Sequence, residues 1–96
     1  MTSPDHLLSV TTSPGGDIVT IHGDLAGIVF LRDSLNTLLT RLSQGECDHK
    51  HFRSPDWAGF ELSTSMLTAE QQAGHITVHH LEVLAWSPER KLKHGL

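Results

Sequence analysis

The stretch that decides the fold is Leu25–Leu42, LAGIVFLRDSLNTLLTRL. Its apolar residues recur three and four positions apart, a spacing that places them on one face of an α-helix. These residues are Leu25, Ile28, Leu31, Leu35, Leu38, Leu39 and Leu42. Asp24 can cap the first turn by accepting backbone N–H groups, and Gly45 is a natural stop. The pattern predicts an amphipathic helix whose apolar face must pack on another layer.

Segments typical of β-strands lie on both sides of this helix. His6–Thr12 and Asp17–His22 are joined by the turn-forming Ser13–Gly16, which predicts a hairpin. After the helix, Asp48–Arg53 and Trp57–Ser63 are separated by a Ser-Pro-Asp turn and predict a second hairpin. Residues 65–74 are expected to form a loop or one irregular helical turn.

The last strand candidate is His75–Trp86, and its alternation slips by one residue. Ile76 and Val78 share one parity, whereas Leu81 and Val83 share the other. One extra residue inside a strand produces a β-bulge, which we expect near His79 and His80.

The predicted fold is therefore α+β, with the order β-β-α-β-β-β. We expect two layers: a five-stranded, mostly antiparallel sheet and the long amphipathic helix packed on one of its faces. A chain of 96 residues is expected to form a single domain over 1–96. Its ordered core should span about residues 6–87, with a frayed basic tail over 88–96.

Charge and cysteine content exclude several classes of protein. The formal net charge is −4, and the basic residues cluster only at Arg90, Lys91 and Lys93, so we predict no nucleic-acid binding. No apolar run is long enough to span a membrane, and no signal peptide is visible. Cys47 is the lone cysteine, so no disulfide can form within the chain. The expected location is the cytoplasm.

Histidines are unusually frequent, with eight in the chain, and strand parity places several of them together. If Phe52 points to the core, His49 and His51 point to the opposite, open face of the sheet. In the strand predicted over Trp57–Ser63, the core-facing set would be Ala58, Phe60 and Leu62.

The same parity argument adds residues from the other two predicted strands to the open face. Trp57 and Glu61 would lie opposite that core-facing set, and one of His79 and His80 would join them at the bulge. Glu82 would also reach this face if the bulge falls appropriately.

Four interpretations of this face compete. His49, His51 and His80 could bind zinc through three imidazoles, although no accompanying motif of closed ligand spacing is present. A histidine beside Glu61 or Glu82, or one paired with Cys47, could act in catalysis. The face could instead recognise another protein through histidine and tryptophan side chains. Finally, the histidines could simply be solvated.

Four segments together resemble a known family. They are a strand ending in Ile21-His22-Gly23, the Leu25–Leu42 helix, the element Asp48-His49-Lys50-His51-Phe52 and the closing strand Val78–Val83. Over roughly residues 18–84 the chain resembles the immunity protein 32 family of bacterial polymorphic toxin systems. The resemblance implies a cytoplasmic, non-enzymatic protein that binds a toxin. It singles out Asp48, His49 and His51 and carries over no catalytic residue.

We therefore predict an immunity or antitoxin-type protein that neutralises a cognate protein toxin without catalysis, cofactor or metal, and that can form a homodimer. The predicted partner-binding residues are Asp48, His49, His51, Trp57, Glu61, His79 and His80. The alternative function is a small histidine-rich metal-binding protein or a metal-dependent enzyme.

Overall fold

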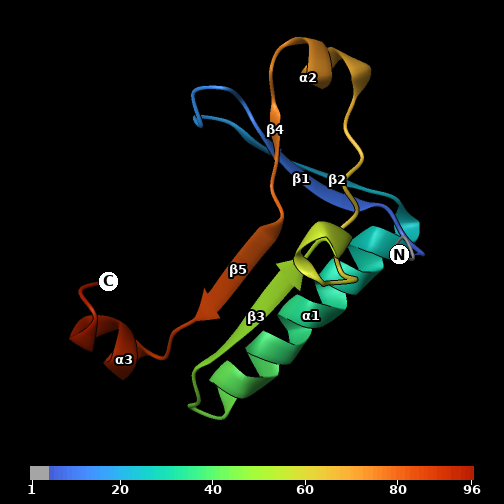
Figure 1. The fold of residues 1–96 in the computed structure, drawn as a ribbon. Coiled ribbons are helices and arrows are strands. Elements are labelled where there is room, and N and C mark those ends of the chain that lie inside the picture. Colours follow the sequence, from blue (N-terminus) through green and yellow to red (C-terminus); the bar gives the residue numbers. More distant parts are fainter. Residues whose placement is uncertain (1–4) are drawn as a thin grey trace.

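The structure is a computed structural model that describes residues 5–96. Its elements in chain order are β1 (Leu8–Thr12), β2 (Val19–Gly23), α1 (Leu25–Ser43), β3 (Asp48–Arg53), the 3₁₀ helix η1 (Pro55–Trp57), α2 (Thr68–Gln72), β4 (Ile76–Thr77), β5 (His80–Ala85) and α3 (Pro88–Lys93). The predicted α+β class is confirmed, as is the order of five antiparallel strands around one long helix (Figure 1). The strands form two small sheets instead of one.

Helix α1 begins and ends where the sequence predicts. The Asp24 carboxylate accepts the Gly27 N–H at 2.8 Å, and this hydrogen bond lowers the pKa of Asp24. At the other end Gly45 takes a left-handed conformation with φ of 77°. The helix lies beside β3 and β5, and it contacts β2 near its N-terminal end (Figure 1).

The first sheet has three strands in the order β2-β1-β4. The predicted hairpin is present, with Val10 opposite Ile21 and Thr12 opposite Val19. On the other side of β1, Thr11 pairs with Thr77. Because β1 is the central strand, four of its five residues are buried. The first sheet is therefore organised around β1.

The second sheet contains β3 and β5, and it corrects the prediction of one continuous last strand. His75–Trp86 is divided in two: β4 pairs with β1, and β5 pairs with β3. The change takes place at Val78, whose N–H still donates to Val10 of β1, and at His79, whose carbonyl accepts from Ser54 after β3. The parity slip that predicted a bulge marks the point where the chain passes from one sheet to the other.

The predicted strand over Trp57–Ser63 is wrong. Pro55–Trp57 form η1, and Ala58 follows with φ of 62°. Gly59 then lies so close to Arg53 that any side chain in its place would collide with the Arg53 backbone. These residues turn the chain back over the end of β3, so the expected alternation of faces is lost.

This loop also changes which of its residues enter the core. Leu62 is fully buried, as predicted, and its N–H donates to the Arg53 carbonyl. Phe60, however, is 71% exposed and Ala58 is also exposed, although both were predicted to face the core. The loop is fixed to the first sheet because the Ser63 N–H donates to the Leu8 carbonyl at 2.8 Å.

The core lies where the two sheets meet α1. Leu8 and Val10 of β1 pack with Phe52 of β3 and Leu62 of the loop. Phe30 of α1 meets Phe52 edge to face, with ring centroids 6.0 Å apart and nearly perpendicular planes. Further apolar side chains packed on this cluster are Leu31, Val78, Leu81 and Val83.

The two ends of the domain carry short helices. Residues 65–74, predicted as a loop or a helical turn, contain α2 at the end of the molecule where β4 lies (Figure 1). Within the tail predicted to be frayed, Pro88–Lys93 form α3, whose first turn is capped by the Ser87 hydroxyl. Among residues 5–96, no helix is both long and apolar enough to cross a membrane.

Candidate functional site

The outer face of β3 carries two neighbouring imidazole rings. Phe52 is buried, so the residues on either side of it in the alternation point away from the core. His49 and His51 therefore lie on the same face, and their ring centroids are 4.9 Å apart at an interplanar angle of 81°. The parity prediction for these two residues is confirmed.

His80 joins this face from β5. It pairs in register with Arg53, so it lies diagonally across from His51. His51 Nδ1 and His80 Nε2 are 2.8 Å apart, which is hydrogen-bonding distance. One ring must donate and the other must accept, so the contact persists only while at least one of the two rings is neutral.

The position of Glu82 favours one direction of that hydrogen bond. Its Oε2 lies 3.4 Å from His51 Nε2. An ionised carboxylate can only accept hydrogen bonds, so it favours the His51 tautomer with hydrogen on Nε2. His51 Nδ1 is then the acceptor, and His80 donates to it. A directed row runs from His80 through His51 to Glu82.

Trp57 and His79 extend the row of rings beyond β3. The indole stacks on the His79 ring with an interplanar angle of 7° and centroids 6.1 Å apart, and it lies 6.3 Å from the His80 ring. Trp57 is nevertheless 55% exposed. We call His49, His51, His79, His80 and Trp57 together the histidine surface.

The support for His79 comes from residues that the sequence did not single out. The fully buried Ser54 holds His79 Nδ1 at 2.7 Å from its hydroxyl oxygen. Asp56 Oδ2 lies 3.8 Å from the same nitrogen. Asp56 and Trp57 both belong to η1. The Trp57 indole therefore rests on a His79 ring that Ser54 and Asp56 hold in place. A Ser-Pro-Asp-Trp turn gave no signal of this role.

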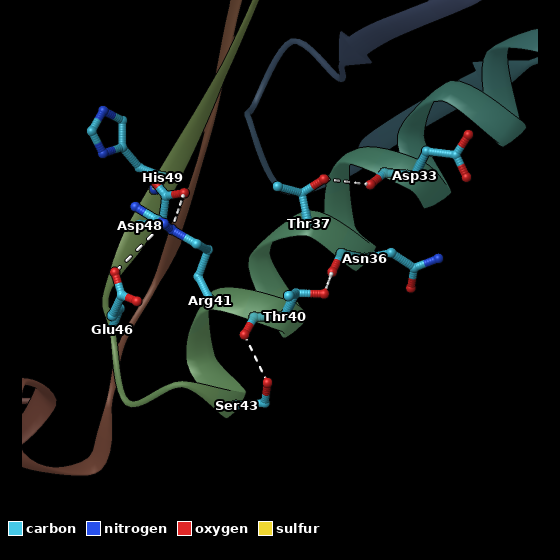
Figure 2. A network of polar contacts seen from close by, with 9 residues as sticks. All are labelled: Asp33, Asn36, Thr37, Thr40, Arg41, Ser43, Glu46, Asp48 and His49. Carbon is cyan, nitrogen blue, oxygen red and sulfur yellow. Dashed lines mark hydrogen bonds and ion pairs between the residues drawn. The ribbon is translucent and has the colours of Figure 1, made fainter.

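Asp48 belongs to the same strand but has a structural role. Its Oδ1 accepts the His49 N–H at 2.8 Å, and its Oδ2 lies 3.4 Å from Arg41 Nε at the end of α1. The hydrogen bond from His49, followed by the charge of Arg41, lowers the pKa of Asp48. Figure 2 shows Asp48 turned toward Arg41 while His49 points away from the helix.

Glu61 is also committed to the backbone. Its Oε1 accepts the Arg53 N–H at 2.8 Å, which ties the loop to the end of β3. Its main-chain carbonyl oxygen lies 2.6 Å from His6 Nε2. The residue was predicted for the open face as part of a strand, but the structure uses its carboxylate to hold the loop in place.

Cys47 contacts Ser87 and not a histidine ring. Its sulfur accepts the Ser87 N–H at 3.3 Å and lies 3.5 Å from the Ser87 hydroxyl. These hydrogen bonds, that of the hydroxyl first, lower the pKa of the Cys47 thiol. A cavity of about 290 Å³ lies beside it, lined by Cys47, Asp48, His49, Leu84, Ala85 and Trp86. The cysteine–histidine pair that the sequence left open as an alternative is not formed.

A second histidine contact, unforeseen from the sequence, lies in the first sheet. Glu70 lies in residues 65–74, which were expected to form a loop or one helical turn, and its carboxylate is buried between α2, β1 and β2. It lies 2.9 Å from His22 Nε2 and accepts from the Thr11 hydroxyl at 3.0 Å and from the Leu67 N–H at 2.9 Å. The Leu67 hydrogen bond is the main reason why the pKa of Glu70 is lowered.

The metal interpretation finds no geometric support. Across residues 5–96, no group of three or more His, Cys, Asp or Glu side chains is placed to hold a metal ion. Two of the three ligands named for this alternative, His51 and His80, direct ring nitrogens at each other.

Comparison with known proteins returned no matching family model, no similar curated protein and no similar solved structure. The resemblance to the immunity protein 32 family therefore stays a prediction that depends on the residues quoted above.

Proposed function

We propose that this chain binds and neutralises a cognate bacterial protein toxin in the cytoplasm, without catalysing a reaction, and that the histidine surface is where the toxin binds. The observation that carries the proposal is the exposed indole of Trp57, stacked on the anchored ring of His79. An indole that is half exposed yet held in one position is typical of the anchors that dominate protein–protein binding.

Preorganisation makes this surface suitable for tight binding. Side chains that must be ordered on association cost free energy, which subtracts from affinity. Here the Trp57 ring is already stacked, and His51 and His80 already hold each other at 2.8 Å. A partner that covers these rings would desolvate aromatic area at little cost in side-chain entropy.

The charges around the histidine surface favour a partner that brings basic groups. Glu82 and Asp56 border the rings, and the chain has a net charge of −4. Such acidic groups raise the rate of encounter with a basic protein and discriminate among partners. A charge of −4 is modest, so specificity would depend mainly on the aromatic contacts.

The resemblance to the immunity protein 32 family implies a toxin encoded beside this chain, so the test is protection of bacteria that express such a neighbouring toxin domain. The wild-type chain should restore growth, whereas Trp57→Ala should not. The alanine variant should bind the purified toxin domain at least about 2 kcal/mol, or roughly 30-fold, more weakly. Because the indole lies outside the core, the thermal midpoint of Trp57→Ala should match that of the wild type.

The matched control is Leu92→Ala, which removes an exposed apolar side chain from α3 that is not part of the histidine surface. This variant should protect as well as the wild type. Full protection by Trp57→Ala would show that the toxin binds elsewhere. Failure of the wild-type chain to bind the toxin domain would reject the proposed function itself.

A further inference from the structure

Helix α1 has a wider apolar face than the strands cover. Leu38 is buried against the strands, but Ile28, Leu35 and Leu39, which follow a neighbouring line along the helix, are exposed. Leu39 is 62% exposed. A groove of about 360 Å³ runs along this line, and it is lined by Ile28, Leu31, Arg32, Leu35, Asn36 and Leu39.

The core-facing side of the first sheet is also left open at β2. Val10 is buried and stands opposite Ile21, and Thr12 stands opposite Val19. Residues directly opposite each other in an antiparallel pair project from the same face. Val19 and Ile21 therefore extend the face that Val10 buries, yet both are exposed, Val19 by 60%.

These two apolar regions meet at the start of the helix. Strand β2 runs almost directly into α1 (Figure 1). The Ile28 side chain lies against Gly23, so close that a Cβ placed on Gly23 would be 2.6 Å from Ile28 Cδ1. We call the continuous region formed by Val19, Ile21, Ile28, Leu35 and Leu39 the α1–β2 apolar surface. It shares no residue with the histidine surface.

The dimensions of the chain show that it is more extended and exposes more surface than a compact monomer of its size. Its radius of gyration is 15.1 Å, whereas a compact chain of this length has about 12.5 Å. It exposes 6391 Å², whereas a folded monomer of 10.6 kDa exposes about 5,500 Å². The excess of about 900 Å² matches the area that each partner contributes to a standard interface, about 800 Å².

Charge and strand topology favour a second copy of the same chain as the partner. Around a two-fold axis like meets like, so a self-complementary surface must be nearly free of net charge. The charged residue that lines the groove is Arg32, and Asp33 already neutralises it at 3.0 Å. Strand β2 is also an edge of the first sheet, whose free backbone groups can pair with the same strand of another copy.

We propose that two copies of this chain form a symmetric dimer through the α1–β2 apolar surface, with their β2 edges adjacent. The dimer covers Ile28, Leu35 and Leu39 of both copies. The histidine surface of each copy remains free, so a dimer presents two toxin-binding faces. The dimer does not depend on the proposed function, because it requires no toxin.

Sedimentation equilibrium of the untagged full chain tests the proposal. The wild type should have a mass near 21 kDa, twice that of one chain of 10.6 kDa. Leu39→Glu and Val19→Lys should each weaken the dimer by at least about tenfold, because each buries a charge in an apolar contact. Leu92→Glu, an equally exposed leucine on α3, should leave the dimer intact.

Two further measurements keep the test decisive if a variant folds poorly. Circular dichroism should show that Leu39→Glu retains the helix, since the side chain points to solvent in one copy. Hydrogen exchange in the wild type should show the β2 amides protected at high concentration and less so on dilution. A monomeric wild type would overturn the proposal, as would a dimer that neither Leu39→Glu nor Val19→Lys weakens. In a monomeric chain, loss of toxin protection in Leu39→Glu would assign the surface to the toxin.

Discussion

In residues 5–96, two histidine rings lie against a glutamate carboxylate, and the two contacts have opposite roles. In the first sheet, Glu70 is buried and lies 2.9 Å from His22 Nε2, and it also accepts from the Thr11 hydroxyl and the Leu67 N–H. On the second sheet, Glu82 is exposed and lies 3.4 Å from His51 Nε2. The same pair of residue types stabilises the fold where it is enclosed and leaves a surface available where one face is open.

The largest effect is expected when the buried carboxylate is removed. Glu70→Ala leaves the Leu67 N–H, the Thr11 hydroxyl and His22 without their acceptor. Buried donors without partners destabilise the native state. The thermal midpoint, followed by circular dichroism, should fall by at least about 5 °C. A variant that melts with the wild type would mean that water replaces the carboxylate, and that the enclosed contact is not structural.

The next largest effect is on how the stability of the fold depends on acidic pH. The hydrogen bonds of the native state stabilise the ionised form of Glu70 and lower its pKa below the ordinary 4.5. The contribution of this carboxylate to the free energy of unfolding is therefore fully present above pH 4.5. As the pH falls from 4.5 through that lowered pKa, the stability is lost. Glu70→Gln should be less stable at neutral pH and show a shallower decline in acid. Asp24 and Asp48 also have lowered pKa values, so the quantity to compare is the difference between the two urea-unfolding curves at each pH.

A smaller effect is expected from the exposed counterpart. Glu82→Ala removes an acceptor that water can replace, so the free energy of unfolding should change by less than about 1 kcal/mol. The midpoint should lie within about 2 °C of the wild type in the same melting experiment. A fall as large as that of Glu70→Ala would show that the outer face of β3 and β5 is itself part of the stabilising framework.

The smallest effect is expected from removal of metal. If the histidine surface holds its rings by contacts among themselves, a chelator should leave the melting curve of untagged protein unchanged. Native mass spectrometry should show chains without zinc. One zinc per chain, lost on chelation together with several degrees of stability, would make His51 and His80 ligands and would revive the alternative function.

Local sequence patterns predicted the parts of the fold that are held by local contacts. The three- and four-residue spacing located α1 and its cap, and parity placed His49 and His51 on one face of β3. The prediction of strands was wrong after Pro55, where the left-handed conformation of Ala58 and the close approach of Gly59 to Arg53 reverse the chain. Alternation cannot report such a reversal, so Phe60 was assigned to the core although it is exposed.

The remaining errors have a common physical cause: the partner is far away in the sequence. The sequence around Glu70 indicated only a loop or a helical turn. Its role as an acceptor depends on Thr11 and His22, which lie far away in the sequence, in the hairpin of β1 and β2. His79 and His80 were assigned to one strand because a change of sheet and a bulge produce the same slip in pattern. Propensity carries no information about contacts of this range.

The passage of the chain from β4 to β5 has a consequence for the timing of folding. Thr11 in the central strand pairs with Thr77, and Arg53 pairs with His80. Neither sheet can therefore be completed until most of the chain has been synthesised. Pairings between such distant segments form late and slowly. The histidine surface, which includes His79 and His80, is assembled among the last parts of the molecule. A nascent or truncated chain ending before residue 79 would lack it, so any protection would begin only after translation has passed that point.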